Sequence, residues 1–326
     1  MKIHGFGLVF VVFLGLILFA PVLTATGQDS QDQQPAPPDA APSTAPAKPE
    51  PKLDLTPDAN GKLSQEQMQA LLRLVADRYL ENDKRQLNYT YIEDDEKRHL
   101  DGKGEIKSTE RETYEILEIY GDPVQRLIER NGKPLDAKEA AKEEDKIQKI
   151  IDKRKHESDE DRKKREEKEV KDREDGRAFV RDIADAYNFT LLGTETLGGR
   201  EAWVISGEPR HGFVPHAKEG KYLPKFHGQV WIDKSDLQFV KLDVECLETF
   251  SWGMFLARFH KGSRFLLEQT RVNDEVWLPL HVAYKIDARL GLVKSIDVES
   301  DQTYRDYKKF RTKSRIVRVG EVTEQN

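Results

Sequence analysis

The feature that most constrains the fold of this chain is the succession of strand-like runs in its second half. From Leu191 onward, short apolar or alternating runs recur at regular intervals, and turn-forming residues separate them. Residues 239–247 alternate most clearly, with Val240, Leu242 and Val244 on one side and charged residues between them. Side chains along a strand point to opposite faces in turn, so this pattern indicates one covered and one solvent-exposed face. Many such strands joined by turns predict an antiparallel sheet or an open barrel.

A helix is predicted before these strands, over residues 64–82. Ser64 followed by Gln67 fits a capping box, in which each side chain satisfies a backbone N–H group of the other residue. Apolar residues then recur at helical spacing: Met68, Leu71, Leu72, Val75, Tyr79 and Leu80. We therefore expect an amphipathic helix that covers the apolar side of the sheet.

Strand signals begin just after this helix. They cover residues 87–91, 113–120 and 124–130. Asn131-Gly132 closes the last of these runs, and this dipeptide is the strongest short hairpin signal because the turn needs positive φ at both positions. The sequence therefore predicts that the sheet starts before the charged segment that follows.

Residues 136–177 form a charged segment of a different character, with 15 basic and 16 acidic residues. Opposite charges recur there four residues apart, which supports an exposed helix. Ile147, Ile150 and Ile151 are its one apolar spot. We predict a solvated helical insert, and the alternatives are partial disorder or a partner-binding arm. Apolar residues at 179–187 predict a short amphipathic stretch that docks on the core.

The N-terminus indicates export from the cytoplasm. Lys2 precedes an almost wholly apolar run over residues 6–23, and the small residues Ala25 and Gly27 follow it. This order is typical of a secretory signal peptide, which we assign to residues 1–27. An uncleaved membrane anchor is the alternative, because a run of about 18 residues is just long enough to span a bilayer. Both interpretations place the rest of the chain in the periplasm.

Composition suggests how the rest is divided. Residues 28–60 contain eight prolines and show no apolar periodicity, which is typical of a disordered linker. Residues 61–312 are predicted to form a single β-rich domain that contains the charged insert, and residues 313–326 a C-terminal tail. The net charge of −6 gives no basic footprint for nucleic acid. Cys246 is the only cysteine, so no internal disulfide can form, and we expect this thiol to be buried.

The sequence lacks the standard catalytic and cofactor signatures. It contains no Gly-x-Ser-x-Gly elbow, no His-Glu-x-x-His motif and no phosphate-binding or dinucleotide-binding loop. His211, His216 and His227 lie within 17 residues, but their spacing fits no standard metal site. We therefore predict no enzyme activity, no cofactor and no metal.

A surplus of large apolar residues is the more informative feature. The simplest interpretation is that they fill the core; the alternative is that some line a cavity, which would suit an acyl chain. Arg258, His260 and Lys261 follow the densest run and could meet an anionic head group. The candidate lining residues are Trp231, Phe250, Trp252, Phe255, Phe259 and Trp277.

Two stretches resemble the periplasmic lipoprotein-carrier superfamily, which includes LolA-like carriers, outer-membrane receptors and a sigma-factor regulator. They are Gly199–Ile205, and Gly228–Lys241 with its Val-Trp-Ile-Asp strand and turn. The resemblance covers about residues 64–312 apart from the charged insert, and it matches no ligand-contacting residue individually. It implies an unclosed antiparallel barrel with a helical lid, which binds lipid or acylated protein.

Together these features predict an α+β fold that is mainly antiparallel β. We expect an unclosed curved β-barrel with the amphipathic helix on its concave face and a charged helical insert. The predicted function is a non-enzymatic periplasmic binding protein for lipid or acylated protein such as a lipoprotein, with an envelope protein as a further partner. The alternatives are a structural or interaction protein of the cell envelope with a filled core and, least favoured, an enzyme whose site has no sequence signature.

Overall fold

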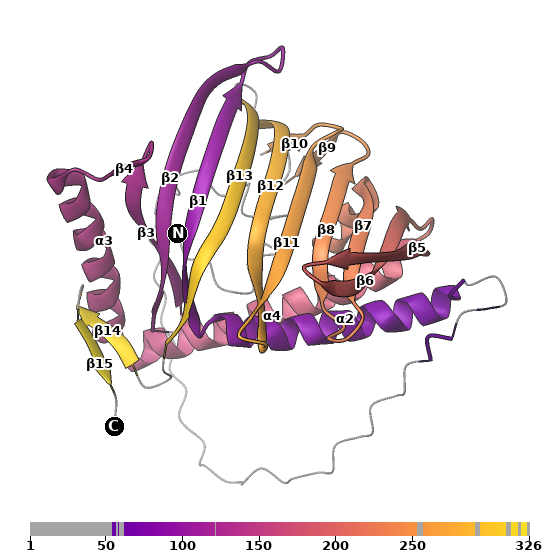
Figure 1. Ribbon diagram of the computed structural model, residues 1–326, viewed down its shortest axis with the longest axis horizontal. Helices are drawn as coiled ribbons and strands as arrows, with labels where there is room; N and C mark the ends of the chain where they lie inside the picture. Colours follow the sequence, from indigo (N-terminus) through magenta and orange to yellow (C-terminus); the bar gives the residue numbers. More distant parts are fainter. Residues whose placement is uncertain are drawn as a thin grey trace, which may run out of the picture.

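The fold is built on one long antiparallel sheet (Figure 1). The computed structural model describes residues 54–56, 58, 62–120, 122–252, 257–290, 294–310, 314–318 and 321–324. The strands of the sheet are β1 (Tyr89–Leu100), β2 (Ile106–Ile119), β3 (Asp122–Arg130), β4 (Lys133–Pro134), β5 (Tyr187–Leu197), β6 (Arg200–Pro209), β7 (Phe226–Asp233), β8 (Phe239–Cys246), β9 (Phe250–Trp252), β10 (Ala257–Phe259), β11 (Arg264–Val272), β12 (Val276–Leu290) and β13 (Lys294–Lys309).

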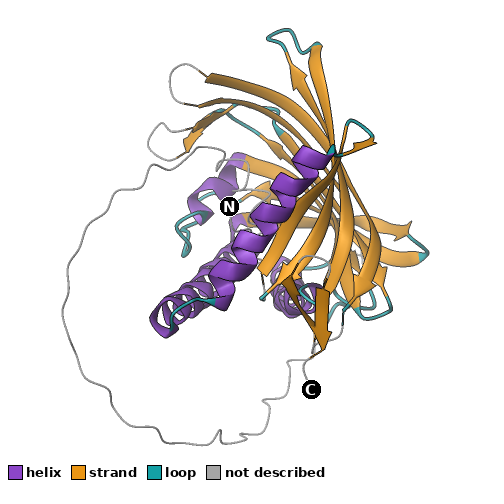
Figure 2. Cartoon of the chain, turned by 90° about the vertical axis from the view of Figure 1, so that its left-hand side faces the viewer, coloured by secondary structure: helices purple, strands orange, loops and turns teal. Residues whose placement is uncertain are grey.

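The order of the strands shows that the barrel is not closed. They lie side by side as β4-β3-β2-β1-β13-β12-β11-β8-β7-β6-β5. In addition, β10 pairs with the last residues of β12, and β9 pairs with β10. Among the described strands, β4 and β5 are the two ends of this path and do not pair with each other. The sheet curves strongly, and the helices gather on its concave side (Figure 2). The predicted fold class is confirmed.

Tight turns of the expected kind join neighbouring strands. Asn131 and Gly132 have φ values of 53° and 71° and link β3 to β4. Gly198 and Gly199, with 56° and 79°, do the same between β5 and β6. Consecutive positive φ values match the right-handed twist of the flanking strands, which explains why the hairpin signal at Asn131-Gly132 was reliable.

Helix α2 (Gln65–Gln86) covers part of the concave face. The Ser64 side chain accepts a hydrogen bond from the Gln67 N–H group, and the Gln67 side chain accepts one from the Ser64 N–H group, which confirms the capping box. Its apolar side chains share a core with residues of β5, β6 and β7. The buried apolar residues of α2 are Met68, Leu71, Leu72, Val75, Ala76 and Tyr79.

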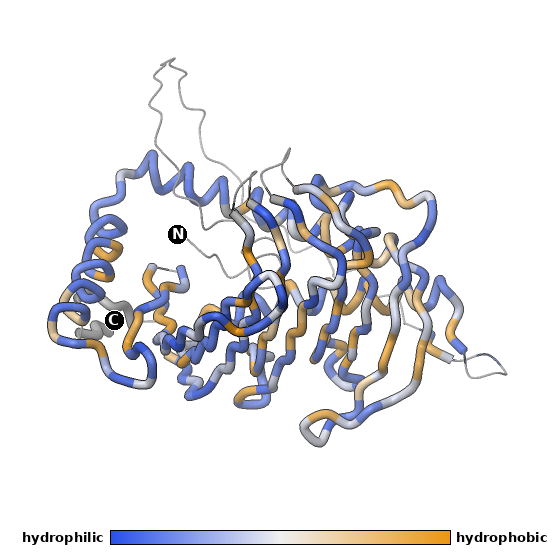
Figure 3. The backbone as a smooth tube through the Cα atoms, turned by 90° about the horizontal axis from the view of Figure 1, so that it is seen from above, coloured by the Kyte–Doolittle hydropathy of each residue, from blue (hydrophilic) through white to orange (hydrophobic). Residues whose placement is uncertain are grey.

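The charged insert forms two helices, α3 (Ala137–Lys155) and α4 (Asp159–Ala186). Figure 3 shows that hydrophilic residues dominate the helical coils beside the sheet. Two residues of the apolar spot of α3 are nevertheless fully buried, because Ile147 and Ile151 pack against Leu117 and Ile119 of β2, and Ile150 is partly buried beside them. The last turns of α4 place Phe179 and Ala184, together with Ala186, in the same core as α2, which confirms the predicted docking stretch.

A bulge changes the face of one predicted core residue. The register of β7 against β8 shifts where Trp231 pairs with Lys241 and Ile232 pairs with Phe239. Val240 lies in this irregularity and packs with Trp231, whereas Leu242 and Val244 pack on the concave side. The prediction that Val240 shares their face was therefore wrong, because strict alternation fails at a bulge.

The segments at the two ends of the chain are described only in part. The predicted signal peptide at 1–27 lies outside the described residues, as does most of the linker. At the end of that linker, the Gln67 side chain donates hydrogen bonds to the Asp54 and Thr56 carbonyl groups. The tail contains a hairpin of β14 (Ser314–Arg318) and β15 (Glu321–Glu324). Within the described residues, no helix is both long and apolar enough to cross a membrane.

Candidate apolar binding site

A cavity of about 140 Å³ lies on the concave face, between α2, α4 and strands β5 to β8. This volume is similar to that of engineered apolar cavities that stay dry and take up benzene. Its wall is almost entirely apolar. The lining residues are Leu72, Val75, Ala76, Tyr79, Phe179, Val180, Ile183, Ala184, Tyr187, Phe189, Ile205, Gly207, Leu223, His227, Gly228, Gln229, Val230, Phe239, Leu242 and Val244.

Small residues leave the space that the cavity occupies. Ala76 on α2 and Ala184 on α4 are both buried in its wall. On the sheet, Gly207 pairs directly with Gly228 across β6 and β7. A Cβ atom on Gly228 would lie 2.3 Å from the backbone oxygen of Asp243, so β7 can run this close to β8 only with glycine there. Gly207 in turn makes room for the Phe189 ring, which a Cβ atom at this position would meet at 3.1 Å.

Few polar groups border this cavity. The Tyr187 hydroxyl donates a hydrogen bond to the Leu223 carbonyl oxygen at 2.7 Å, and burial raises the pKa of this tyrosine far above its usual value. A ring nitrogen of His227 lies 3.4 Å from a carboxylate oxygen of Glu208. None of the described lining residues is Lys or Arg. The site is therefore suited to a neutral apolar group.

Trp231 and Trp277, two of the predicted lining residues, lie elsewhere. Trp231 alternates along β7 with Val230 and Ile232, which face α2, so it points to the opposite face. Its indole N–H group donates to a Glu195 carboxylate oxygen at 2.6 Å.

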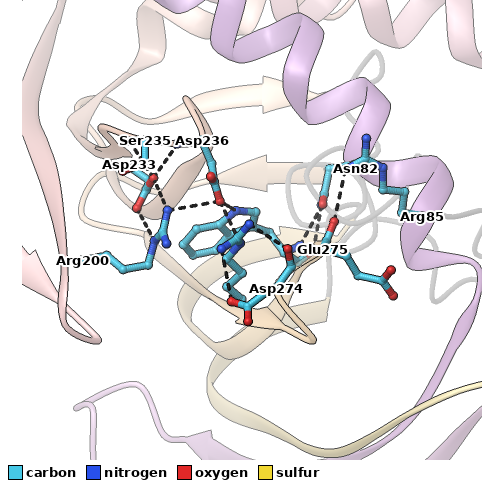
Figure 4. Close-up of polar contacts among 10 residues, drawn as sticks. Asn82, Arg85, Arg200, Asp233, Ser235, Asp236, Asp274 and Glu275 are labelled. Atoms are coloured by element: carbon cyan, nitrogen blue, oxygen red, sulfur yellow. Dashed lines mark hydrogen bonds and ion pairs between the residues drawn. The ribbon is translucent and has the colours of Figure 1, made fainter.

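Trp277 belongs to the same cluster as Trp231 and is held by a polar network at the end of α2. The Asn82 side chain exchanges two hydrogen bonds with the Trp277 backbone, at 2.7 and 2.8 Å. The indole N–H group donates to Asp236, which also pairs with Arg200 (Figure 4). Trp277 therefore fixes α2 onto β12 and is absent from the cavity lining.

Phe250 and Phe259, from the two ends of the predicted aromatic run, belong to a separate cluster at the edge of the sheet. The rings of Phe250 and Phe259 stack at 5.4 Å, and Tyr222 and Phe226 contact Phe250. Trp252 belongs to β9, and Phe255 lies outside the described residues. This aromatic edge cluster does not line the described cavity, so ligand contact there stays a prediction.

Two buried carboxylates also lie on the concave face, outside the cavity lining. Glu93 and Asp95 lie on β1, where Glu93 faces Tyr304 of β13 and Tyr114 of β2. Tyr304 packs with Leu267, and Leu267 belongs to the same cluster as the cavity-lining Phe239. The carboxylates therefore share the face of the cavity.

Glu93 has charged and titratable neighbours on every side. Burial, and then the negative charge of Asp95, raise the pKa of Glu93 to about 7. A hydrogen bond from Gln125 of β3 and the positive charge of Lys97 act in the opposite direction and lower this pKa. The Ser300 hydroxyl of β13 donates to Asp95 at 2.6 Å, and the Lys97 ammonium group lies 3.3 Å from it. Glu112 of β2 pairs with Asp95 in the sheet register, and Tyr284 of β12 is next to Ser300. Protonation of Glu93 is therefore linked to this whole group.

The histidines in the loop region do not converge. A ring nitrogen of His216 lies 2.9 Å from the buried Asp182, whereas His227 pairs with Glu208. Within the described part of the chain, no three His, Cys, Asp or Glu side chains gather as a metal site requires. Cys246 is buried and unpaired, as predicted.

Comparisons with known proteins give structural likenesses alone. No family model and no curated protein matches the chain. An outer membrane lipoprotein-sorting protein domain from Vibrio parahaemolyticus is similar at 13% identity and a TM-score of 0.32, covering 76% of this chain and 94% of that one. A LolA superfamily protein from Nitrosomonas europaea is similar at 9% identity and a TM-score of 0.30, covering 75% of this chain and 94% of that one.

MucB, in a complex with MucA(peri), is a further similar structure. The identity is 10% and the TM-score 0.20, with 73% of this chain and all of that one covered. Among these proteins are members of the superfamily that the two sequence stretches resemble. Because the identities and TM-scores are low, the function proposed below rests on the residues of this chain.

Proposed function

We propose that this protein is a non-enzymatic periplasmic binding protein that holds the acyl part of a lipid or of an acylated protein. The apolar cavity between α2, α4 and β5 to β8 carries the proposal. Burying an apolar chain there would remove it from water, which favours binding by about 25 cal/mol for each Å² of apolar surface. Carriage and sensing of lipoproteins are both compatible with such a site.

Two further features support binding over a purely structural role. The cavity wall is assembled from three separate parts of the chain, and it has small residues on facing helices, Ala76 on α2 and Ala184 on α4. Protein interiors are normally packed with few voids larger than a water molecule. A cavity kept open by small residues is therefore better explained by an occupant than by core packing.

The test fills the cavity from its own wall. Ala76→Phe and Ala184→Phe should abolish binding of fluorescent N-phenylnaphthylamine and of medium-chain acyl compounds that displace it. The full exported chain should also release co-purifying lipid in native mass spectrometry. If the larger residue prevents folding, Ala76→Leu fills less space and should weaken binding in the same direction.

Ala140→Phe is the matched control, since Ala140 is exposed on α3 and remote from the cavity. It should bind like the natural protein. Unchanged binding by folded Ala76→Phe and Ala184→Phe proteins would contradict the proposed site. Absence of any bound or added apolar ligand would favour a structural or interaction role in the envelope.

A further inference from the structure

Two arginines face each other across neighbouring strands at one end of the sheet. Arg258 of β10 pairs with Arg289 of β12 in a regular antiparallel register. Ser251 of β9 and Ser295 of β13 continue this arginine row on either side, and all four residues are exposed. Residues paired in this way share a face and have Cβ atoms about 5 Å apart, so like charges there repel each other.

The arginine row lies on the face of the sheet opposite the apolar cavity. The neighbours of the two arginines, Phe259 and Ala288, pair with each other and belong to one apolar cluster. Tyr284 packs against that cluster and also against the cluster of the cavity-lining Phe239. No register shift interrupts β12 against β13 between Tyr284 and Arg289, so side chains alternate regularly there. The row is therefore a surface separate from the cavity, on the convex side.

Neither arginine has an acidic partner among the described residues. The nearest acids in the register are Asp287 and Asp297, which face each other in the adjoining row. The Asp287 carboxylate lies 3.0 Å from the Nδ1 atom of His260. Of the basic residues that follow the aromatic run in the sequence, His260 is therefore already paired and Arg258 is not.

A second pair of facing cations shows how the same sheet neutralises such charges elsewhere. Arg264 of β11 faces Lys285 of β12, four residues before Arg289. The Arg264 Nε atom lies 2.8 Å from Asp243, and the Lys285 Nζ atom lies 2.8 Å from Glu299. Both acids are supplied by neighbouring strands. The outer positions of the arginine row hold serines instead, so no acid in that row neutralises its charge.

The chemistry of two adjacent guanidinium groups fits a phosphate. Each guanidinium presents paired N–H donors that match two phosphate oxygens. A phosphate held between them would offset their mutual repulsion, whereas a carboxylate has only two oxygens to share between both groups. We propose that the arginine row binds a phosphate group, supplied by a lipid head group or by a soluble compound. This site is additional to the cavity and does not depend on the function proposed for it.

The test uses two probes on the full exported chain at low ionic strength. Inorganic phosphate is titrated by calorimetry, and phosphatidylglycerol vesicles are tested by co-sedimentation. Combining Arg258→Gln with Arg289→Gln should weaken binding about tenfold for each arginine removed, because hydrogen bonds between charged groups are lost. The probe that binds should raise the melting temperature of the natural protein and leave that of this double variant unchanged.

Arg264→Gln with Lys285→Gln is the matched control, since it removes the same charge from the same face but from cations that have acidic partners. It should bind both probes like the natural protein. Binding of the vesicles assigns the phosphate to a lipid, and binding of inorganic phosphate without the vesicles assigns it to a soluble compound.

Three results would overturn the inference: unchanged binding by the arginine variant, an equal loss in the control, or no binding of either probe by the natural protein. N-phenylnaphthylamine should bind in the cavity of both double variants as in the natural protein, because none of the four substituted residues lines it. Failure of the phosphate site is therefore distinguishable from failure of the proposed function.

Discussion

At the scale of single residues, the surroundings of Glu93 disfavour the charged form of its carboxyl group. It is 6% exposed, faces two tyrosines across the sheet, and has Asp95 as its nearest inward-facing neighbour on β1. Its pKa is raised to about 7, first by burial and then by Asp95. Glu93 should therefore titrate near neutral pH.

The raised pKa makes the stability of the protein depend on pH in a defined direction. Because the folded state holds the proton more tightly than the unfolded state, the stabilising effect is complete below about pH 4.5 and is lost as pH rises through about 7. The loss at Glu93 is of the order of 3 kcal/mol at most.

Glu93→Gln should remove this dependence, since the amide stays neutral. The variant should be similar to the natural protein at low pH and more stable above about pH 7, as measured by urea unfolding over a pH series. A difference between the two proteins that stays constant with pH would show that Glu93 titrates normally.

At the scale of elements, a buried ion pair fixes the charged insert to the sheet. The Arg154 side chain at the end of α3 is 3% exposed and pairs with Asp122, which is 9% exposed at the start of β3. Arg154 also contacts Glu157, and Glu157 pairs with Arg165 of α4. This network links both helices to one edge of the sheet.

Removing the cation should be strongly destabilising, because the buried Asp122 carboxylate loses its ion pair with Arg154. Arg154→Met should lower the free energy of unfolding by about 3–5 kcal/mol in urea titrations. Arg162→Met breaks the exposed pair with Asp159 and should change the free energy of unfolding by less than about 1 kcal/mol. Equal effects of the two substitutions would argue against a structural role for the buried pair.

At the scale of the whole molecule, the sheet has two separate apolar regions that could hold a ligand. The cavity lies under α2 and α4, and the aromatic edge cluster of Phe250 and Phe259 lies at β9 and β10. They are distinct in their residues, so substitutions can tell them apart.

Phe259→Ala should leave binding of N-phenylnaphthylamine unchanged if the cavity is the site. It should lower stability by about 1–3 kcal/mol, less than a fully buried phenylalanine, because Phe259 is only partly buried. Loss of binding without loss of stability would move the site to the aromatic edge cluster, as the sequence first suggested.

Local patterns in the sequence were sufficient to predict several elements of this fold, although β1 runs on to Leu100, well beyond the predicted run at 87–91. The capping box at Ser64, the positive-φ pair at Asn131-Gly132 and the period of the α2 apolar residues depend on neighbours only a few positions away. The side of the sheet to which Val240 points was predicted wrongly, because Val240 lies in a bulge. A bulge depends on how β8 pairs with β7, and the sequence of β8 alone does not determine this pairing.

The cavity was determined by tertiary structure alone. Aromatic density in the sequence pointed to Trp231, Phe250 and Trp277, whereas the described space is lined by small residues such as Ala76 and Ala184. A void is a property of side chains that are missing from facing elements, and its walls come from segments more than 100 residues apart.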